Sequence, residues 1–332
     1  MFATLLGGLP RPLDAGGGLV SNDDVAVRIV VEAQAAAGLE PLTDGRIRAR
    51  GLIGPAADLD GIALSADGPV RAGMPRWTKP LTVDAWRFAA EVGAGLVKQA
   101  LPGPYTLGRR LGGTDPDAAA AAFGSALRVE VGALIDAGCV LIEIEEPDAH
   151  LIGEDPAERR RFVEAHQMLL DGINGAHVSL AITGGNADTA GVETILAAPY
   201  RSLAVDLIDG PDNWRLVTRT PGDRGIICGA LSARHPSDDS LELLLWAASY
   251  AASTGGRGSE RVGLATAGSL EGLSWEIADS KMRRLGEAGH LASLPFEEAA
   301  PHLDPRAIDI RSAAYGRYMP PKPRKPPGGP IL

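Results

Sequence analysis

The stretch Cys139-Val140-Leu141-Ile142-Glu143-Ile144-Glu145-Glu146-Pro147-Asp148-Ala149-His150 decides the fold class of this chain. Apolar residues lead into three carboxylates, and a proline, which cannot donate to a sheet ladder, ends the run. The stretch is typical of a buried strand that presents Glu143, Glu145 and Glu146 at its carboxyl end. Glu143 and Glu145 are two residues apart, so we expect them on one face. Carboxylates in so apolar a strand indicate either a ligand site or structural ion pairs, and this segment alone does not decide between them.

Similar short apolar runs recur along the chain and alternate with helical segments. Strands are predicted at residues 3–7, 39–44, 96–101, 139–146, 177–183, 202–208, 225–231 and 261–266. Helices are predicted between them, and residues 52–79, rich in Gly, Pro, Asp and Ala, are predicted to form a long excursion. Such alternation calls for parallel strands with right-handed crossovers.

The absence of two phosphate-binding motifs narrows the fold further. Neither GxGxxG after a strand nor GxxxxGK[ST] occurs in the sequence. Eight strand–helix units without them predict an α/β protein with a single closed (β/α)8 TIM barrel rather than an open doubly wound sheet. We assign residues 1–315 to the barrel domain and residues 316–332 to a proline-rich C-terminal tail.

Composition and charge exclude several classes of partner. The chain has 332 residues, of which 45% are hydrophobic and 22% charged, as is typical of globular proteins. A formal charge of −10 argues against a nucleic-acid partner. No uninterrupted apolar run long enough for a membrane span and no basic leader are present, so we expect a cytoplasmic protein without membrane contact. Cys139 and Cys228 lie in apolar strand patterns and are expected to be packing residues rather than a disulfide.

In a closed barrel the chemistry lies where strands end and helices begin. Polar residues at those predicted strand ends come from segments far apart in the sequence, and the fold would bring them to one mouth. They are Asp44, Arg46, Tyr105, Arg109, Glu145, Glu146, Asn186, Asp206, Asp209, Ser232, Arg234 and Ser269. This placement alone does not name a reaction.

Several motifs resemble, in the same order, those of cobalamin-independent methionine synthase. Thr78-Lys79-Pro80-Leu81-Thr82-Val83 and Gly103-Pro104-Tyr105-Thr106 resemble its K-P-x-T-V and G-P-x-T pair, and Ile144-Glu145-Glu146-Pro147 takes the place of its I-D-E-P strand. Leu6-Gly7-Gly8-Leu9-Pro10 resembles I-G-S-F-P, and Asp44-Gly45-Arg46 resembles D-G-E. The resemblance covers most of the chain. It implies a (β/α)8 barrel shared with uroporphyrinogen decarboxylase and a role in one-carbon metabolism.

The positions that match the family's zinc ligands differ from the family pattern. Its histidine, two cysteines and glutamate correspond to Ala181, Thr183, Ala267 and Asp206, of which only Asp206 offers a good ligand. One carboxylate does not hold Zn²⁺ with useful affinity, so we expect no zinc.

The family's amino-acid pocket has also changed. The serine, glutamate and aspartate that bind the amino acid in the family correspond to Gly8, Arg46 and Glu145. A guanidinium prefers a carboxylate or phosphate to an ammonium, so we expect an anionic small molecule rather than homocysteine. Alternatively, Arg46 and Glu145 form an ion pair that closes a vestigial site. The tryptophan that the family has shortly after its G-P-x-T loop corresponds to a position near Arg109 and Arg110. Two arginines there are compatible with the anionic tail of a folate-type methyl donor, so such a donor stays an alternative.

The sequence therefore predicts a divergent, metal-free methyl or alkyl transferase. Candidate catalytic residues are Glu145, Glu143 and Asp206, and candidate substrate-binding residues are Gly8, Arg46, Asn186, Tyr105, Arg109 and Ser232. One alternative is a uroporphyrinogen-decarboxylase-like lyase, and another is a non-catalytic small-molecule-binding barrel, which the lost zinc ligands favour. A third is a 5-methyltetrahydrofolate-dependent methionine synthase, if the zinc ligands lie elsewhere in the sequence.

Overall fold

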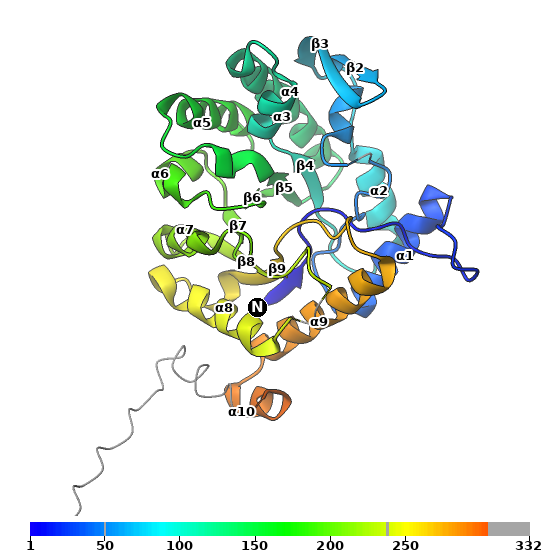
Figure 1. Ribbon diagram of the computed structural model, residues 1–332, viewed down its shortest axis with the longest axis vertical. Coiled ribbons are helices and arrows are strands. Elements are labelled where there is room, and N and C mark those ends of the chain that lie inside the picture. Colours follow the sequence, from blue (N-terminus) through cyan, green and yellow to red (C-terminus); the bar gives the residue numbers. More distant parts are fainter. Residues whose placement is uncertain (50, 237–238, 305–332) are drawn as a thin grey trace, which may run out of the picture.

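The computed structural model describes residues 1–49, 51–236 and 239–304. At its centre is a curled parallel sheet of seven strands in the order β1-β9-β8-β7-β6-β5-β4 (Figure 1). The strands are β1 (Phe2–Thr4), β4 (Gln99–Pro102), β5 (Leu141–Glu145), β6 (His177–Ile182), β7 (Ser202–Asp206), β8 (Gly225–Leu231) and β9 (Val262–Thr266). Each of the seven lies at a predicted strand, so the α/β class and the parallel arrangement are confirmed.

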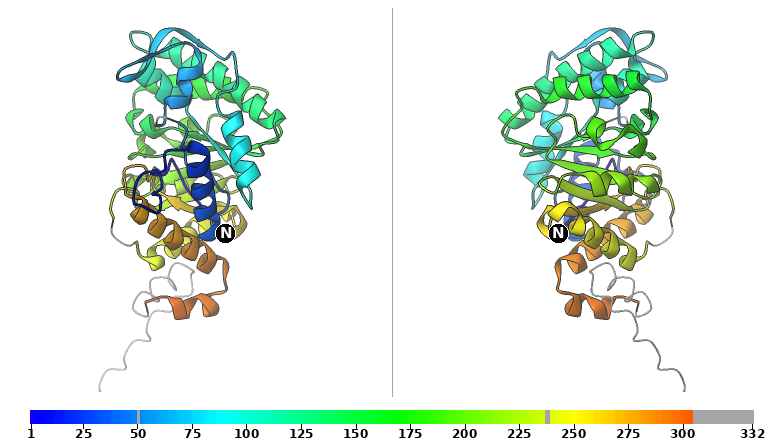
Figure 2. Two further views of the ribbon diagram at one scale, coloured as in Figure 1. Left: turned by 90° about the vertical axis from the view of Figure 1, so that its right-hand side faces the viewer. Right: turned by 90° about the vertical axis from the view of Figure 1, so that its left-hand side faces the viewer.

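Helices cover the outer side of this sheet, except the short α10, which lies apart from it beyond α9 (Figures 1 and 2). They are α1 (Asp23–Ala36), α2 (Val83–Val92), α3 (Pro104–Leu111), α4 (Pro116–Asp136), α5 (Pro156–Leu170), α6 (Val192–Ile195), α7 (Trp214–Arg219), α8 (Leu241–Ser253), α9 (Trp275–Ser293) and α10 (Phe296–Ala299). Several begin where a polar side chain accepts a hydrogen bond from the first turn; these caps are Asn22, Asp115, Asp155, Ser240 and Ser274.

The segment 39–44, predicted as the second barrel strand, is not a strand of the sheet. It makes an isolated parallel bridge between Leu42 and Val97, and the amide of Glu40 donates to the carbonyl of Ala3 over 2.8 Å. Pro41 lies within the segment and has no N–H, which interrupts regular pairing. The sheet accordingly has seven strands instead of the eight that the sequence predicts.

The excursion predicted over residues 52–79 contains a second, small sheet. A 3-10 helix (Gly54–Asp58) leads into an antiparallel hairpin of β2 (Asp60–Ser65) and β3 (Gly68–Arg76). The hairpin packs against α3 and α4 and lies outside the central sheet, beyond its β4 edge (Figures 1 and 2).

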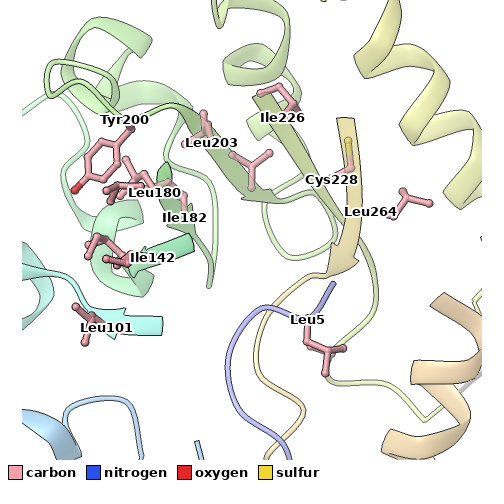
Figure 3. Close-up of a cluster of buried hydrophobic side chains, with 14 of the residues drawn as sticks. Leu5, Leu101, Ile142, Leu180, Ile182, Tyr200, Leu203, Ile226, Cys228 and Leu264 are labelled. Carbon is pink, nitrogen blue, oxygen red and sulfur yellow. The ribbon is translucent and has the colours of Figure 1, made fainter. Parts of the chain in front are cut away.

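Apolar side chains fill both faces of the central sheet. The main core lies between the sheet and the helices and includes Ile142, Leu180, Leu203 and Cys228 (Figure 3). A second cluster lies on the opposite, inner face of the strands and is formed by Leu6, Ala181, Ala204, Ile227 and Ala265. The two clusters follow from the alternation of side chains along each strand. We call the second cluster the inner apolar cluster.

Both cysteines are packing residues of the described chain. Cys139 and Cys228 are buried free thiols. Burial raises the pKa of Cys139 to about 11 and that of Cys228 to about 12, so neither thiol ionises near neutral pH.

Helix α4 is, by length and composition alone, long and apolar enough to cross a membrane, and half of its apolar window is buried inside the protein. Its buried face packs against α3 and α5, the arrangement of a core helix. The predicted domain boundary at residue 315 and the predicted tail 316–332 lie outside the described residues.

Candidate functional site

A pocket of about 500 Å³ lies at the β4 edge of the central sheet, between β4, the segment 43–49 and the β2–β3 hairpin. It is lined by Gly7 after β1, the segment 43–49, residues of β4, the 3-10 helix, the start of α2 and the tip of the β2–β3 hairpin. Its polar lining side chains include Thr43, Asp44, Arg46, Arg48 and Gln99. The volume suits a small-molecule ligand, and Gly7 after β1 and Pro102 at the end of β4 place one wall on the side where barrel enzymes bind substrates. We call it the mouth pocket.

Arg46 in the wall of the mouth pocket forms an ion pair with Glu145. Its Nη2 donates to Glu145 Oε2, and its Nη1 lies 3.9 Å from Glu271 Oε1. The backbone amide of Gly7 donates to the other oxygen of Glu145 over 3.2 Å. Burial works against the cation, but Glu145 and Glu271 outweigh it and raise the pKa of Arg46. The ion pair that the sequence left as an alternative is therefore formed.

Asp44 brings a second carboxylate to the same pocket. The backbone amide of Arg46 donates to Asp44 Oδ1 over 2.9 Å, which fixes the side chain in a tight turn. Burial raises the pKa of Asp44, although the amide of Arg46 and the charges of Arg46 and Arg48 oppose the shift. Arg48 itself pairs with Asp24 and lies 4.5 Å from the centre of the Phe88 ring. The sequence placed Asp44 at a strand end but did not assign it to the site.

Gly8 leaves room for Glu271, a residue that the sequence analysis missed. A Cβ on Gly8 would lie 2.1 Å from Glu271 Oε1, so a larger residue would displace that carboxylate. The Gly8 amide donates to Ser269 Oγ over 3.2 Å, which holds the two loops together. The sequence feature that could have identified Glu271 is its position in the loop that follows the last predicted strand, residues 261–266.

Glu143, the other candidate catalytic carboxylate of β5, has a different neighbour. Lys98 Nζ donates to Glu143 Oε2 and to the carbonyl of Leu5, both over 2.7 Å. Burial raises the pKa of Glu143, and the charge of Lys98 opposes this. Glu143 Oε1 has no hydrogen-bond partner among the described residues. Glu143 lines a cavity at the amino-terminal end of the sheet rather than the mouth pocket.

Glu146, which ends the same stretch, anchors helix α3. Its carboxylate accepts the backbone amides of Tyr105 and Thr106, each over 2.8 Å, and the Thr106 hydroxyl over 2.5 Å. A Cβ on Gly103 would lie 2.1 Å from Glu146 Oε1, which explains the glycine before the helix. A carboxylate at a helix N-terminus is stabilised by the exposed amides and the helix dipole. The role of Glu146 is therefore structural.

Asp206 and Asn186 hold loops at the carboxyl ends of β6 and β7. Asp206 accepts the backbone amides of Ile208 and Asp209 over 2.9 Å and of Gly184 over 3.1 Å. Burial raises the pKa of Asp206, and these three hydrogen bonds oppose the shift. Asn186 accepts the amide of Asp212 over 2.9 Å. Neither residue lines the mouth pocket.

Three further candidates make their contacts elsewhere. The hydroxyl of Tyr105 donates to Glu158 over 2.7 Å, and Arg109 pairs with the same carboxylate at 2.9 Å, so both lie between α3 and α5. Ser232 Oγ accepts the amide of His235 over 3.2 Å. Of the predicted site residues, the structure brings Gly8, Arg46 and Glu145 together, with Asp44 and Glu271 joining them.

The positions that match the family's zinc ligands do not fit a zinc ion. Thr183 lies near Gly268, and Asp206 binds the amide of Gly184, so these strand ends do converge. Ala181, however, belongs to the inner apolar cluster, and the Asp206 carboxylate accepts hydrogen bonds from three backbone amides. Within residues 1–49, 51–236 and 239–304, no group of three or more His, Cys, Asp or Glu side chains could hold a metal ion.

Comparison with solved structures relates this fold to known proteins. A B12-independent methionine synthase from a Shewanella species, in complex with selenomethionine, superposes with a TM-score of 0.76 at 17% identity, over 90% of this chain and 98% of that one. A putative vitamin-B12-independent methionine synthase from Listeria monocytogenes gives 0.69 at 16% identity, over 87% and 97%. A methyltransferase from Methanosarcina mazei gives 0.57 at 15% identity, over 87% and 94%.

These similarities define a barrel-like fold of the methionine-synthase type. At such low identity they show a shared fold and no more. No protein-family model matches the chain, and no curated protein sequence matches it.

Proposed function

We propose that the protein is a transferase that moves a methyl or alkyl group to an anionic small molecule bound in the mouth pocket. The observation that carries the proposal is Arg46, a guanidinium in the pocket wall held by Glu145. The fold shared with methionine synthases and a methyltransferase supports the reaction class. The segment 39–44 takes the place of the eighth strand in this proposal and completes the ring that carries Arg46.

The pair with Glu145 orients the guanidinium toward the pocket. Because Nη2 is occupied by Glu145 and Nη1 is 3.9 Å from Glu271, Nη1 remains available for a substrate carboxylate or phosphate. An incoming anion would displace Glu271, whose side chain is 36% exposed, more easily than Glu145, whose side chain is 6% exposed.

Asp44 is the group best placed to carry a proton in such a transfer. When a folate-type donor gives its methyl group to a thiol, the donor's nitrogen–carbon bond breaks and a sulfur–carbon bond forms. The thiol proton finally reaches the donor nitrogen, so one proton passes through the site. Asp44 lines the pocket, and its raised pKa makes it a stronger base than an exposed aspartate.

Two ligands that differ only in the ammonium group test the charge of the pocket. Homocysteine and 4-mercaptobutyrate have the same carbon chain and thiol, but only homocysteine carries an ammonium. We expect 4-mercaptobutyrate to bind at least about tenfold more tightly by calorimetry, a difference of roughly 1.4 kcal/mol. Arg46→Gln should remove that binding, whereas Arg110→Gln, at a residue paired with Asp148 outside the pocket, should leave it unchanged.

Equal binding of the two ligands, or unchanged binding by Arg46→Gln, would contradict the anion site. Methyl transfer from 5-methyltetrahydrofolate to 4-mercaptobutyrate, followed by mass spectrometry, tests the reaction itself. Metal analysis of the purified protein is the accompanying control. One zinc per chain that is lost on chelation would favour the methionine synthase alternative.

One observation favours a second candidate, a binding protein without catalysis. Both oxygens of Glu145 are occupied, one by Arg46 and one by the amide of Gly7, so this carboxylate is not free to act as a base. Anion binding without any transfer product, and unchanged by Asp44→Asn, would support that candidate.

A further inference from the structure

We propose that the cavity at the amino-terminal end of the sheet is a second binding site, for a small, neutral, largely apolar molecule that carries one hydroxyl group. The cavity has a volume of about 710 Å³ and is lined by the first residues of several strands. Phe2, Leu141, Ser179, Ser202 and Ile227 contribute to its wall. We call it the lower cavity.

Glu143 supplies an acceptor that the protein itself leaves unpaired. The side chain is 1% exposed and lines the lower cavity. Lys98 occupies Oε2, while Oε1 has no partner among the described residues. A buried carboxylate oxygen without a donor is unfavourable, so its presence in a ligand-sized cavity indicates a site for a donor group.

The lower cavity is separate from the mouth pocket. Ala181 and Ala204 follow Ser179 and Ser202 by two residues on β6 and β7, so they point to the same side, one step nearer the carboxyl end. Together with Leu6, Ile227 and Ala265 they form the inner apolar cluster. The lower cavity and the mouth pocket have no lining residue in common, so they are distinct sites.

Charge balance favours a hydroxyl over an ammonium. Lys98 already neutralises Glu143, and a second cation beside the same carboxylate would leave an uncompensated buried charge. Three other acidic residues and three arginines also line the cavity, so these charges balance and favour neither a cationic nor an anionic ligand. They are Glu40, Asp223 and Glu260, and Arg201, Arg224 and Arg261.

Two other polar side chains of the cavity wall, those of His177 and Ser202, are already paired, so Glu143 is the group that recognises the ligand's hydroxyl. His177 Nε2 lies 2.9 Å from Ser202 Oγ, so these two side chains satisfy each other. Burial and the charge of Arg201 lower the pKa of His177, which keeps the ring neutral at physiological pH. Most of the remaining wall is aliphatic or aromatic, which suits a hydrocarbon body.

Three probes with the same ring test the chemistry of the site. Cyclohexylmethanol, cyclohexylmethylamine and cyclohexanecarboxylate are titrated into the full chain with labelled isoleucine methyl groups. We expect the alcohol to shift the Ile227 methyl signal with an affinity at least about tenfold above that of the amine and the carboxylate. Equal affinities, or no shift of the Ile227 signal, would overturn the proposal.

Two variants assign the binding to Glu143 and to this cavity. Glu143→Gln keeps an oxygen for Lys98 but turns the free acceptor into an amide donor, and it should weaken alcohol binding at least about tenfold. Ser179→Leu fills the cavity and should abolish binding, which keeps the test decisive if Glu143→Gln does not fold. Arg48→Gln, in the wall of the mouth pocket, should leave alcohol binding unchanged, so failure here is distinct from failure at the mouth pocket. Unaltered binding by both cavity variants would refute the site.

Discussion

The three glutamates of the central strand show how neighbouring residues of one type take different roles. Glu143 pairs with Lys98, Glu145 with Arg46, and Glu146 with the first amides of α3. Each partner comes from another part of the chain. The role of each carboxylate is therefore set by what the fold places beside it.

A pH-dependent stability difference is expected at Asp44. Its pKa is raised by burial above the ordinary 3.8, so the folded state favours the protonated form. Its contribution is fully present below pH 3.8 and is lost as the pH rises through the folded-state pKa. Asp44→Asn removes this titration and keeps an acceptor for the Arg46 amide. The stability of Asp44→Asn relative to the unmutated protein should thus increase as the pH rises from about 4 to 7.

Urea unfolding at several pH values measures this difference. Asp136→Asn, at an exposed position at the end of α4, controls for the loss of one negative charge. A stability difference at Asp44 that decreases with pH would contradict the assigned direction.

At the scale of residues, the sequence predicted the strand that carries the carboxylates but not the side chains that pair with them. The alternation of Glu143 and Glu145 with isoleucines predicted a buried strand, and that is local information. Lys98, the partner of Glu143, and Glu271, which lies near Arg46, are distant from β5 in sequence, and no spacing rule links them to it. The predicted convergence of Tyr105, Arg109, Asn186 and Ser232 on one mouth assumed that strand-end residues point inward. Their side chains instead bond to neighbouring helices and loops.

At the scale of elements, the sequence predicted where the strands lie, but it did not predict that the segment 39–44 fails to pair as a regular strand. Apolar runs bounded by Gly and Pro located all seven strands of the central sheet. The run at 39–44 is more polar, and Pro41 and a single bridge at Leu42 keep it from becoming a regular strand. The hairpin of β2 and β3 was missed because its residues are mostly exposed and lack clear alternation.

The buried side chain of Arg257 joins two helix ends. It is 0% exposed, and its guanidinium donates over 2.9 Å to each of three carbonyls, those of Thr220 after α7, Ala251 near the end of α8, and Arg224. These include carbonyls that a helix end leaves without an intrahelical partner. One planar guanidinium thus ties α7 and α8 to the start of β8.

Arg257→Lys should lower the free energy of unfolding by about 2–4 kcal/mol, because an ammonium on one atom cannot reach all these carbonyls. Urea denaturation followed by circular dichroism measures the loss. Arg219→Lys, at an exposed site on α7, is the matched control and should change stability by less than about 0.5 kcal/mol. A similar small effect for both variants would show that the carbonyls find other donors.

At the scale of the whole molecule, the segment 39–44 lies between the two edges of the curled sheet. The segment 39–44 bonds to the edge strand β1 and to residues 96–98, which lead into the other edge strand, β4. The amide of Glu40 donates to Ala3, that of Leu42 to Leu96, and that of Lys98 to Leu42. Arg46 follows this segment by a few residues, so the geometry of the mouth pocket depends on how firmly the segment is held.

Amide hydrogen exchange tests whether this segment completes the ring. If it does, the amides of Glu40, Leu42 and Lys98 should be protected to within about tenfold of those in β5, because they would open only when the barrel opens. The amides of the β2–β3 hairpin, outside the central sheet, are the internal control and should exchange much faster. If the three amides exchange like the hairpin, the sheet is open at this edge. Arg46 would then belong to a movable flap, and anion binding at the mouth pocket would require that flap to be ordered first.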